Sequence, residues 1–244
     1  MGCSLKESEK IELMSKFKEW FRTNLSESHK RNTEKLVDPE EFQINPFLLY
    51  YLANYLEGNS NPETLAKVLV YPRVLGTSIT TSFGTGLQSF ISSDWFKAYG
   101  STTQGIDIEF IDQTDGRRKY CQLKSGPNAL NKDDIKTIVD HFKAVKNLAK
   151  TNNKTIALGD LVFALTYGER NELNAFTKAL EDHDVKTLVG KEFWHALTGD
   201  ANFYKSLIVA AGEVAQEFDM KSVVDSVIKK LSKRIESRFK EISE

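Results

Sequence analysis

Regular alternation of apolar and polar residues marks the middle of the chain, from Gly105 to Asn128. Both halves of this segment follow a two-residue period, which is typical of strands that bury one face. Between the halves lies Asp115-Gly116, a dipeptide favoured in two-residue hairpin loops because a type I′ turn needs positive φ at both central positions. The pattern therefore predicts a β-hairpin with Asp115-Gly116 as its loop.

The predicted pairing gathers four polar side chains on one face of the hairpin. Asp107 is expected opposite Lys124, and Glu109 opposite Gln122. Side chains two residues apart on a strand share a face, so all four project together. The other face is apolar and is expected to enter a core, with Ile106, Ile108, Phe110, Cys121 and Leu123.

This set of side chains has two interpretations. Carboxylate and amide oxygens are hard ligands suited to Mg²⁺, and an ammonium group offsets the charge of a phosphate. The same pattern is also typical of a solvated hairpin face with a cross-strand ion pair. The spacing alone does not decide between a metal site and a solvated face.

Helical periodicity dominates the remaining chain. An apolar stripe predicts a helix over 8–24, whereas the polar stretch 24–41 is interpreted as a loop. Further helices are predicted over 46–57, 62–70, 77–91, 132–149 and 204–241. Strands are predicted over 160–167, an apolar run typical of a strand buried on both faces, and over 185–189. The alternation of strands and helices indicates an α/β fold.

Composition and charge restrict the function only moderately. The net charge is −1, so the chain lacks the overall positive charge typical of nucleic-acid-binding proteins. Local basic clusters such as Arg117-Arg118-Lys119 do occur. No apolar run is long enough for a membrane span, and we expect no signal peptide. Two cysteines, Cys3 and Cys121, favour a reducing, cytoplasmic location over a disulfide framework. The four histidines lack metal-ligand spacing and are interpreted as structural or surface residues.

Asp107, the hairpin and Gln122-x-Lys124 resemble the active-site signature of the PD-(D/E)xK nucleases, with glutamine replacing the usual second acid. Longer stretches are similar to one type II restriction endonuclease family, whose members cut sites of the RGGNCCY and GGNCC type. The similarity runs from about Asn45 to Tyr204 and includes Asn45–Leu49, Tyr71–Gly84, both hairpin strands and Val189–Asp200. It implies a mixed sheet flanked by helices, with N- and C-terminal helical extensions.

The resemblance also implies a role for each matching residue. Asp107 corresponds to the metal-ligating acid, Gln122 to a second ligand through its amide oxygen, and Lys124 to the catalytic lysine. Glutamine supplies an oxygen without a charge, so Mg²⁺ is expected to bind more weakly unless another carboxylate helps. Glu109, on the same face, and Glu57, at the end of an upstream apolar run, are the candidates for that carboxylate.

Candidate DNA contacts lie on either side of the hairpin. Thr77, Ser78, Thr80 and Thr81 form a hydroxyl-rich helix start, and Asn128 lies in the turn after the second strand. Small hydroxyl side chains and helix N-termini commonly donate to DNA phosphates. The alternative is that the hydroxyl groups only cap the helix and pack against neighbouring residues.

Together these features predict a sequence-specific type II restriction endonuclease that hydrolyses double-stranded DNA at a palindromic site with Mg²⁺ and leaves 5′-phosphate ends. We expect an N-terminal helical region (1–60), a nuclease core (61–204) and a C-terminal helix (205–244). Part of that last helix, with the N-terminal helix, is expected to form a homodimer interface, because twofold dimers cut palindromes naturally. A cognate DNA methyltransferase is expected in the same system.

Two other functions stay open at this point. A nuclease of the same fold that acts in transposition or DNA repair would share the signature. A DNA-binding protein that lost catalysis is the second alternative, with Gln122 marking the loss.

Overall fold

The computed structural model describes residues 5–96, 98–101 and 103–243, without the side chains of residues 77, 78, 81, 94 and 237–243. Contacts divide the chain into two compact units. Unit 1 comprises Met1–Phe17 and Leu87–Ala210, and unit 2 comprises Lys18–Gly86 and Ala211–Glu244. The three regions expected from the sequence stay a prediction. The contact units differ from them, because residues 61–86, expected in the nuclease core, belong to unit 2.

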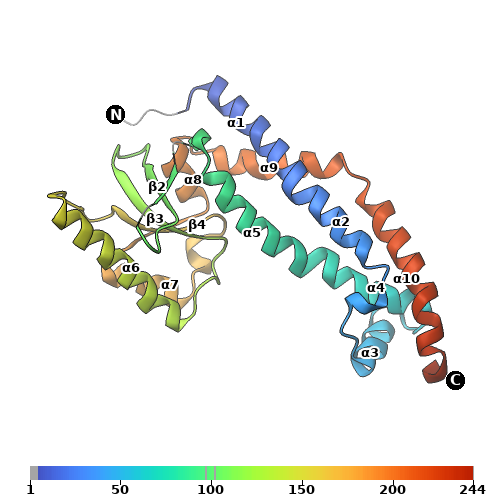
Figure 1. Ribbon diagram of the computed structural model, residues 1–244. Coiled ribbons are helices and arrows are strands. Elements are labelled where there is room, and N and C mark those ends of the chain that lie inside the picture. Colours follow the sequence, from blue (N-terminus) through green and yellow to red (C-terminus); the bar gives the residue numbers. More distant parts are fainter. Residues whose placement is uncertain (1–4, 97, 102, 244) are drawn as a thin grey trace. The chain divides into compact units, whose positions relative to one another are not determined.

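Unit 1 is built on a mixed five-stranded sheet (Figure 1). Its strands lie in chain order: β1 (Tyr99–Gly100), β2 (Ile108–Ile111), β3 (Arg118–Lys124), β4 (Leu161–Leu165) and β5 (Lys186–Val189). The first three strands pair antiparallel, and β3, β4 and β5 pair parallel. This arrangement confirms the predicted mixed sheet, with the hairpin β2–β3 next to the fully buried strand β4.

Helices cover both faces of this sheet. On one face, α6 (Lys132–Thr151) and the short α7 (Ala175–Ala179) border a core that joins Ile138 and Phe142 of α6 to Phe163 of β4. On the other face, Phe193 of α8 (Lys191–Thr198) packs edge-on against Phe110, with 6.1 Å between ring centroids. Strands β3 and β4 are therefore covered on both faces, whereas the edge strand β1 is exposed.

Unit 2 is helical. It holds α2 (Glu27–Lys35), α3 (Pro46–Glu57), α4 (Pro62–Pro72) and α10 (Met220–Ser243), while α1 (Glu7–Trp20), α5 (Ser78–Ile91) and α9 (Phe203–Gln216) cross the unit boundaries. Helices α3 and α4 match the helices predicted over 46–57 and 62–70. Both begin at asparagine caps, where Asn45 and Asn61 accept hydrogen bonds from main-chain N–H groups. The shorter helical turns are η1 (Phe21–Ser26), η2 (Pro39–Glu41), η3 (Arg73–Thr77), η4 (Asp94–Phe96), η5 (Arg170–Glu172) and η6 (Glu181–His183).

Two sequence-based assignments are wrong. The predicted loop over 24–41 is mostly helical, because Thr33 and Leu36 are buried in unit 2 although α2 has few apolar residues. The single helix predicted over 204–241 is interrupted between α9 and α10. Asp219 caps α10, since its Oδ1 accepts the N–H of Ser222 at 3.1 Å, and this local bond favours a new helix start.

The described part of the chain contains no helix that is both long and apolar enough to cross a membrane.

Candidate active site on the hairpin

The hairpin register differs from the predicted one by two residues. Glu109 lies opposite Tyr120, so the predicted pairing of Glu109 with Gln122 is wrong. The predicted pairing of Asp107 with Lys124 is wrong for the same reason, because the register places Asp107 two residues nearer to the start of β3. A shift of two residues leaves every side chain on its predicted face, since the side-chain period is two.

The loop explains the shift. It contains four residues, 113–116, because the N–H of Asp112 donates to the carbonyl of Arg117 at 2.9 Å. The carboxylate of Asp112 accepts from the N–H and the hydroxyl of Thr114, at 2.8 and 2.6 Å. This side-chain turn closes the longer loop, and Gly116 supplies the positive φ, at 72°. The two-residue loop predicted at Asp115-Gly116 is therefore wrong.

Asp107 is fixed between the strands. Its N–H donates to the carbonyl of Cys121 at 3.0 Å, and its Oδ2 accepts the N–H of Leu123 at 2.7 Å. Gln122 is the residue between these two partners, so Asp107 and Gln122 lie side by side on adjacent strands. A hydrogen bond to a charged carboxylate fixes the orientation of that side chain. The other oxygen of Asp107, Oδ1, has no hydrogen bond to any described residue.

Gln122 provides another oxygen without a hydrogen bond to the described residues, beside that of Asp107. Its Oε1 is buried and accepts no hydrogen bond from the described residues. Gln122 is paired with Phe163 of β4, so its side chain projects to the face that α6 covers. A buried, unpaired amide oxygen costs free energy, and it is therefore an oxygen that gains from a ligand.

Lys124 and Glu109 share this face but differ in their contacts. Lys124 is exposed and forms no ion pair with the described residues, so its ammonium group is available to a phosphate. The carboxylate of Glu109 accepts from the hydroxyl of Ser101 at 2.8 Å and from Arg118 at 3.0 Å. Both carboxylate oxygens of Glu109 therefore already have partners. Asp107, Gln122 and Lys124 each carry one polar group without a partner among the described residues.

Glu57, the other candidate carboxylate, belongs to unit 2. Its oxygens accept from the ammonium of Lys67 and the hydroxyl of Thr64, both at 2.9 Å. The hydrogen bond from Lys67, followed by that from Thr64, lowers the pKa of Glu57. Within its own unit the carboxylate thus acts as a link between α3 and α4.

The candidate DNA contacts are only partly described. The side chains of Thr77, Ser78 and Thr81 lie outside the described ones. Thr80 is exposed, and its hydroxyl donates to the carbonyl of Gly76 at 3.3 Å. Asn128 is exposed in the turn after β3. Their role toward DNA stays a prediction.

His141, on α6, lies next to the candidate site, although no sequence pattern indicated such a position. Its ring packs on Gly105, two residues before Asp107, so closely that a Cβ at position 105 would lie 2.1 Å from Nδ1. Nδ1 is buried and has no hydrogen-bond partner among the described residues. Gly105 also has a φ of 81°, which favours glycine. The imidazole therefore limits how the segment before Asp107 can move.

Beneath the hairpin loop, Lys119 is buried among three carboxylates. Its Nζ lies 2.5 Å from Asp115, 3.5 Å from Asp160 and 3.9 Å from Asp112. Burial raises the pKa of Asp115, but hydrogen bonds from Lys119 and from the main chain of Arg117 outweigh it, so the net pKa is lowered. This cluster holds the loop and the start of β4 in place.

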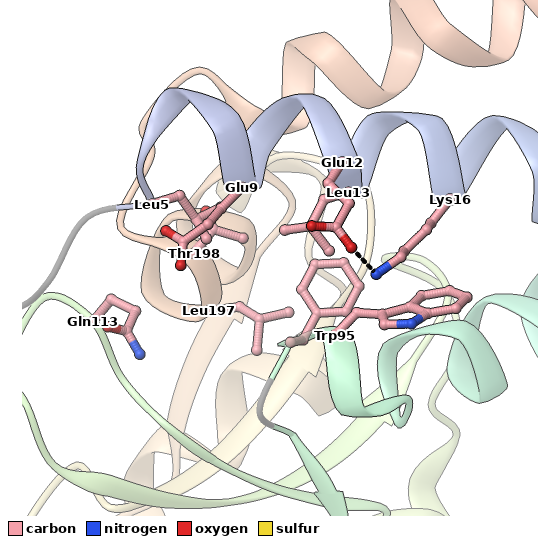
Figure 2. A pocket seen from close by; sticks show the side chains of 10 residues that line it. Leu5, Glu9, Glu12, Leu13, Lys16, Trp95, Gln113, Leu197 and Thr198 are labelled. Atoms are coloured by element: carbon pink, nitrogen blue, oxygen red, sulfur yellow. Dashed lines mark hydrogen bonds and ion pairs between the residues drawn. The ribbon is translucent and has the colours of Figure 1, made fainter.

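A pocket of about 310 Å³ lies elsewhere in unit 1, between α1, the hairpin loop and α8 (Figure 2). Lys16 forms an ion pair with Glu12 and lies over the ring of Trp95, 5.1 Å from its centroid. Leu13 and Leu197 form part of its apolar lining. Since Asp107, Gln122 and Lys124 do not line this pocket, it is not the candidate active site.

Residues 16–219 match the family model of the type II restriction endonuclease EcoO109I. The match covers most of the chain and contains the whole sheet and every candidate residue of the hairpin. The chain belongs to this family. It is therefore a site-specific deoxyribonuclease, a hydrolase that binds and cuts double-stranded DNA. No curated protein matches the chain significantly.

Type II restriction endonucleases generally use a divalent metal ion, and the donor set on the hairpin fits one. Asp107 Oδ1 and Gln122 Oε1 are hard oxygen donors on the same face, and neither is hydrogen-bonded to a described residue. No cluster of three or more histidine, cysteine or acidic side chains suited to a metal occurs among the described residues. Divalent ions such as Mg²⁺ keep several waters and are usually held by one or two carboxylates together with substrate phosphates, so a donor set with one carboxylate is compatible with them.

Proposed function

We propose that this restriction endonuclease cuts a palindromic DNA site in a Mg²⁺-dependent reaction that leaves 5′-phosphate ends. The observation that carries the proposal is a set of three groups on one hairpin face that have no partner among the described residues: Asp107 Oδ1, Gln122 Oε1 and the ammonium of Lys124. A carboxylate, an amide and a lysine on adjacent strands match the chemistry needed to hold a metal ion and a phosphodiester. The family resemblance favours a GC-rich site of the RGGNCCY or GGNCC type.

Each residue has a distinct task in the proposed reaction. Asp107 and Gln122 would hold Mg²⁺, which supplies Lewis-acid stabilisation of charge on the phosphate. Lys124 donates to the phosphate and orients the attacking water, because its ammonium carries hydrogen-bond donors and a positive charge. The water attacks in line with the leaving 3′-oxygen, so the phosphate stays on the 5′ end of the product.

The bond from Leu123 to Asp107 supports this division of tasks. It fixes one carboxylate oxygen of a residue that lies beside Gln122 on the adjacent strand, which reduces the reorganisation needed when the metal binds. Glu109 contributes less in this proposal, because Ser101 and Arg118 already occupy its carboxylate. Its proposed part is to keep β1 and β3 aligned with β2.

The proposal extends to the enzyme's partners. The enzyme acts as a homodimer in the cytoplasm, and a DNA methyltransferase of the same specificity protects the host genome. A dimer places two copies of the hairpin on the two strands of a palindrome, which a single copy cannot cut at once. The weak net charge, −1, is compatible with DNA binding, because local positive potential at the DNA-binding surface is sufficient.

Digestion of unmethylated phage DNA tests the proposed function. Purified protein is incubated with the DNA in Mg²⁺ or in EDTA, and the fragment ends are sequenced. Discrete fragments in Mg²⁺ alone, with 5′-phosphate ends at one palindrome, are the expected result. Intact DNA in every lane, or random fragments, would contradict the proposal, and cutting only at DNA ends or branched substrates would indicate a repair or transposition nuclease.

A further inference from the structure

Helix α3 presents an uninterrupted apolar surface to solvent. Its outward residues, called here the α3 surface, have exposed fractions from 41% to 88%: Phe47, Leu48, Tyr51, Leu52, Tyr55 and Leu56. They form two adjacent rows with a four-residue spacing, and the rings of Tyr51 and Tyr55 stack at 6.1 Å. The buried residues of α3 are Leu49 and Ala53, which join the core of unit 2. Most apolar side chains of this helix are thus not used by its own unit.

The size of the α3 surface is that of an interface. An aromatic side chain buries about 150–250 Å², so the exposed parts of Phe47 (88%), Tyr51 (63%) and Tyr55 (78%) amount to roughly 450 Å². Two copies provide roughly 900 Å² from these rings, and the leucines add to it. A specific interface needs about 1,000 Å² in total. The rings and leucines of two α3 surfaces together therefore reach the lower bound of a specific interface.

Charge favours a second copy over other partners. No charged residue occurs between Pro46 and Leu56. In a twofold pair each surface meets its own copy, so a charged surface repels itself and an uncharged one does not. DNA and anionic membranes both attract Lys and Arg side chains, and this stretch has none.

The apolar stripe of the last helix is already in use. Val227, Ile228, Leu231 and Ile235 of α10 are buried in the core of unit 2 together with Leu65 and Val70 of α4. The sequence predicts that part of this helix, with the N-terminal helix, forms the dimer interface. The buried stripe of α10 packs instead in the core of its own unit. The side chain of Phe239, also part of that predicted stripe, lies outside the described ones. Among the described helices of unit 2, α3 is the one with a row of exposed aromatic rings.

We propose that the α3 surface is where two copies of this chain pair, helix against helix. Rows with a four-residue spacing are the ridges that interlock in the commonest type of helix packing. The inference rests on the proposed function, because it names the surface that forms the homodimer. It adds that dimerisation is built from unit 2, whereas Asp107, Gln122 and Lys124 all belong to unit 1.

Charge variants of the full-length protein test the proposed surface. Tyr51→Glu combined with Tyr55→Glu places like charges on both copies, as does the pair of lysine substitutions at the same positions. Each double variant alone is expected to be a monomer by sedimentation velocity, with a dissociation constant raised at least about 100-fold. A mixture of the acidic and basic variants is expected to form the dimer again, which separates loss of pairing from loss of folding. Leu158→Glu, at an 80% exposed leucine of unit 1, is the matched control and stays dimeric.

Three results would overturn the proposed surface. These are a monomeric wild-type protein with and without DNA, charge variants that dimerise like wild type, and a folded mixture that stays monomeric. Cleavage of phage DNA is measured in parallel, so that the two proposals fail separately. A dimer that loses pairing in the α3 variants but never cuts DNA supports the surface and contradicts the function. An active enzyme whose α3 variants still dimerise supports the proposed function and contradicts the proposed dimer surface.

Discussion

The carboxylate of Asp107 accepts a hydrogen bond from the main-chain N–H of Leu123 at 2.7 Å, across the two strands of the hairpin. This bond connects the candidate metal ligand to the strand that carries Gln122 and Lys124. The second carboxylate oxygen has no hydrogen bond within the described part of the chain, and we propose that it binds the metal ion. The geometry of the candidate site therefore depends on the register of one β-hairpin.

Gln122→Glu is expected to strengthen metal binding, because it adds a negative charge where a neutral, unpaired oxygen now lies. Titration calorimetry of Mn²⁺ into the DNA-free protein measures this directly. A dissociation constant lowered by about tenfold is expected, equivalent to about 1.4 kcal/mol. Gln122→Leu is the opposite variant and should weaken binding. Equal affinities in the wild type and both variants would remove Gln122 from the metal site.

Lys119→Met is expected to destabilise unit 1 by about 3–5 kcal/mol, because it leaves the buried carboxylate of Asp112 without a cation and leaves Asp160 with Arg117 alone. Urea denaturation followed by tryptophan fluorescence gives the change in the free energy of unfolding. Lys154→Met, at an exposed lysine, is the control and should lie within about 0.5 kcal/mol of wild type. A Lys119→Met variant with an unchanged free energy of unfolding would show that the ion cluster contributes little to stability.

The same cluster predicts a response to acid. The lowered pKa of Asp115 means that its pairing with Lys119 stabilises the protein fully above the pKa of the unfolded state, near 3.8. That stability is lost as the pH falls through the lower folded pKa. Wild type and Asp115→Asn should therefore differ in melting temperature at neutral pH and converge at strongly acidic pH. A constant difference at every pH would contradict the pairing.

Two glycines with positive φ provide a matched pair. Gly105→Ala and Gly116→Ala both force alanine into the left-handed region, at a cost of about 1–2 kcal/mol. At position 116 the new methyl group enters open space, whereas at position 105 it meets the ring of His141. Gly105→Ala should therefore lower the melting temperature more. The double variant Gly105→Ala/His141→Ala should be more stable than the sum of its single variants predicts, and strict additivity would argue against the contact.

Cys121 is expected to be unreactive in the folded protein. Burial, with a smaller contribution from the negative charge of Asp107, raises the pKa of its thiol well above the usual value. The thiolate, which is the reactive form, is then scarce. In a Cys3→Ser background, native protein at pH 8 should not react with a thiol reagent, whereas protein in urea should react completely. Rapid native labelling would contradict the buried position of Cys121.

The sequence predicted the faces of the hairpin but not its register. Ile108, Phe110, Cys121 and Leu123 are all buried as expected, because the two-residue period survives a shift of two. The loop length depends instead on the side chain of Asp112, whose bonds to Thr114 cannot be read from the Asp-Gly dipeptide.

Tertiary contacts explain the other differences. Helix α2 has a largely polar sequence and becomes stable through contacts of Thr33 and Leu36, in line with the general dominance of packing over local preference. His141 was not singled out because its neighbour Gly105 is 36 residues away in the sequence, and only the fold brings them together. Lys119 belonged to an apparent surface cluster with Arg117 and Arg118, yet it is 1% exposed.

Single-turnover cleavage by Asp107→Asn, with Glu109→Gln as the matched control, tests the central claim most directly. Both substitutions remove one carboxylate charge from the same hairpin face, but only Asp107 has an oxygen to spare. The account predicts that Asp107→Asn lowers the cleavage rate by at least about 10³-fold, while binding of the same DNA fragment in EDTA is unchanged or tighter. Glu109→Gln is predicted to keep most of the activity. An Asp107→Asn enzyme that cuts like wild type, or equal losses in both variants, would contradict the assignment of Asp107 as the metal-ligating acid.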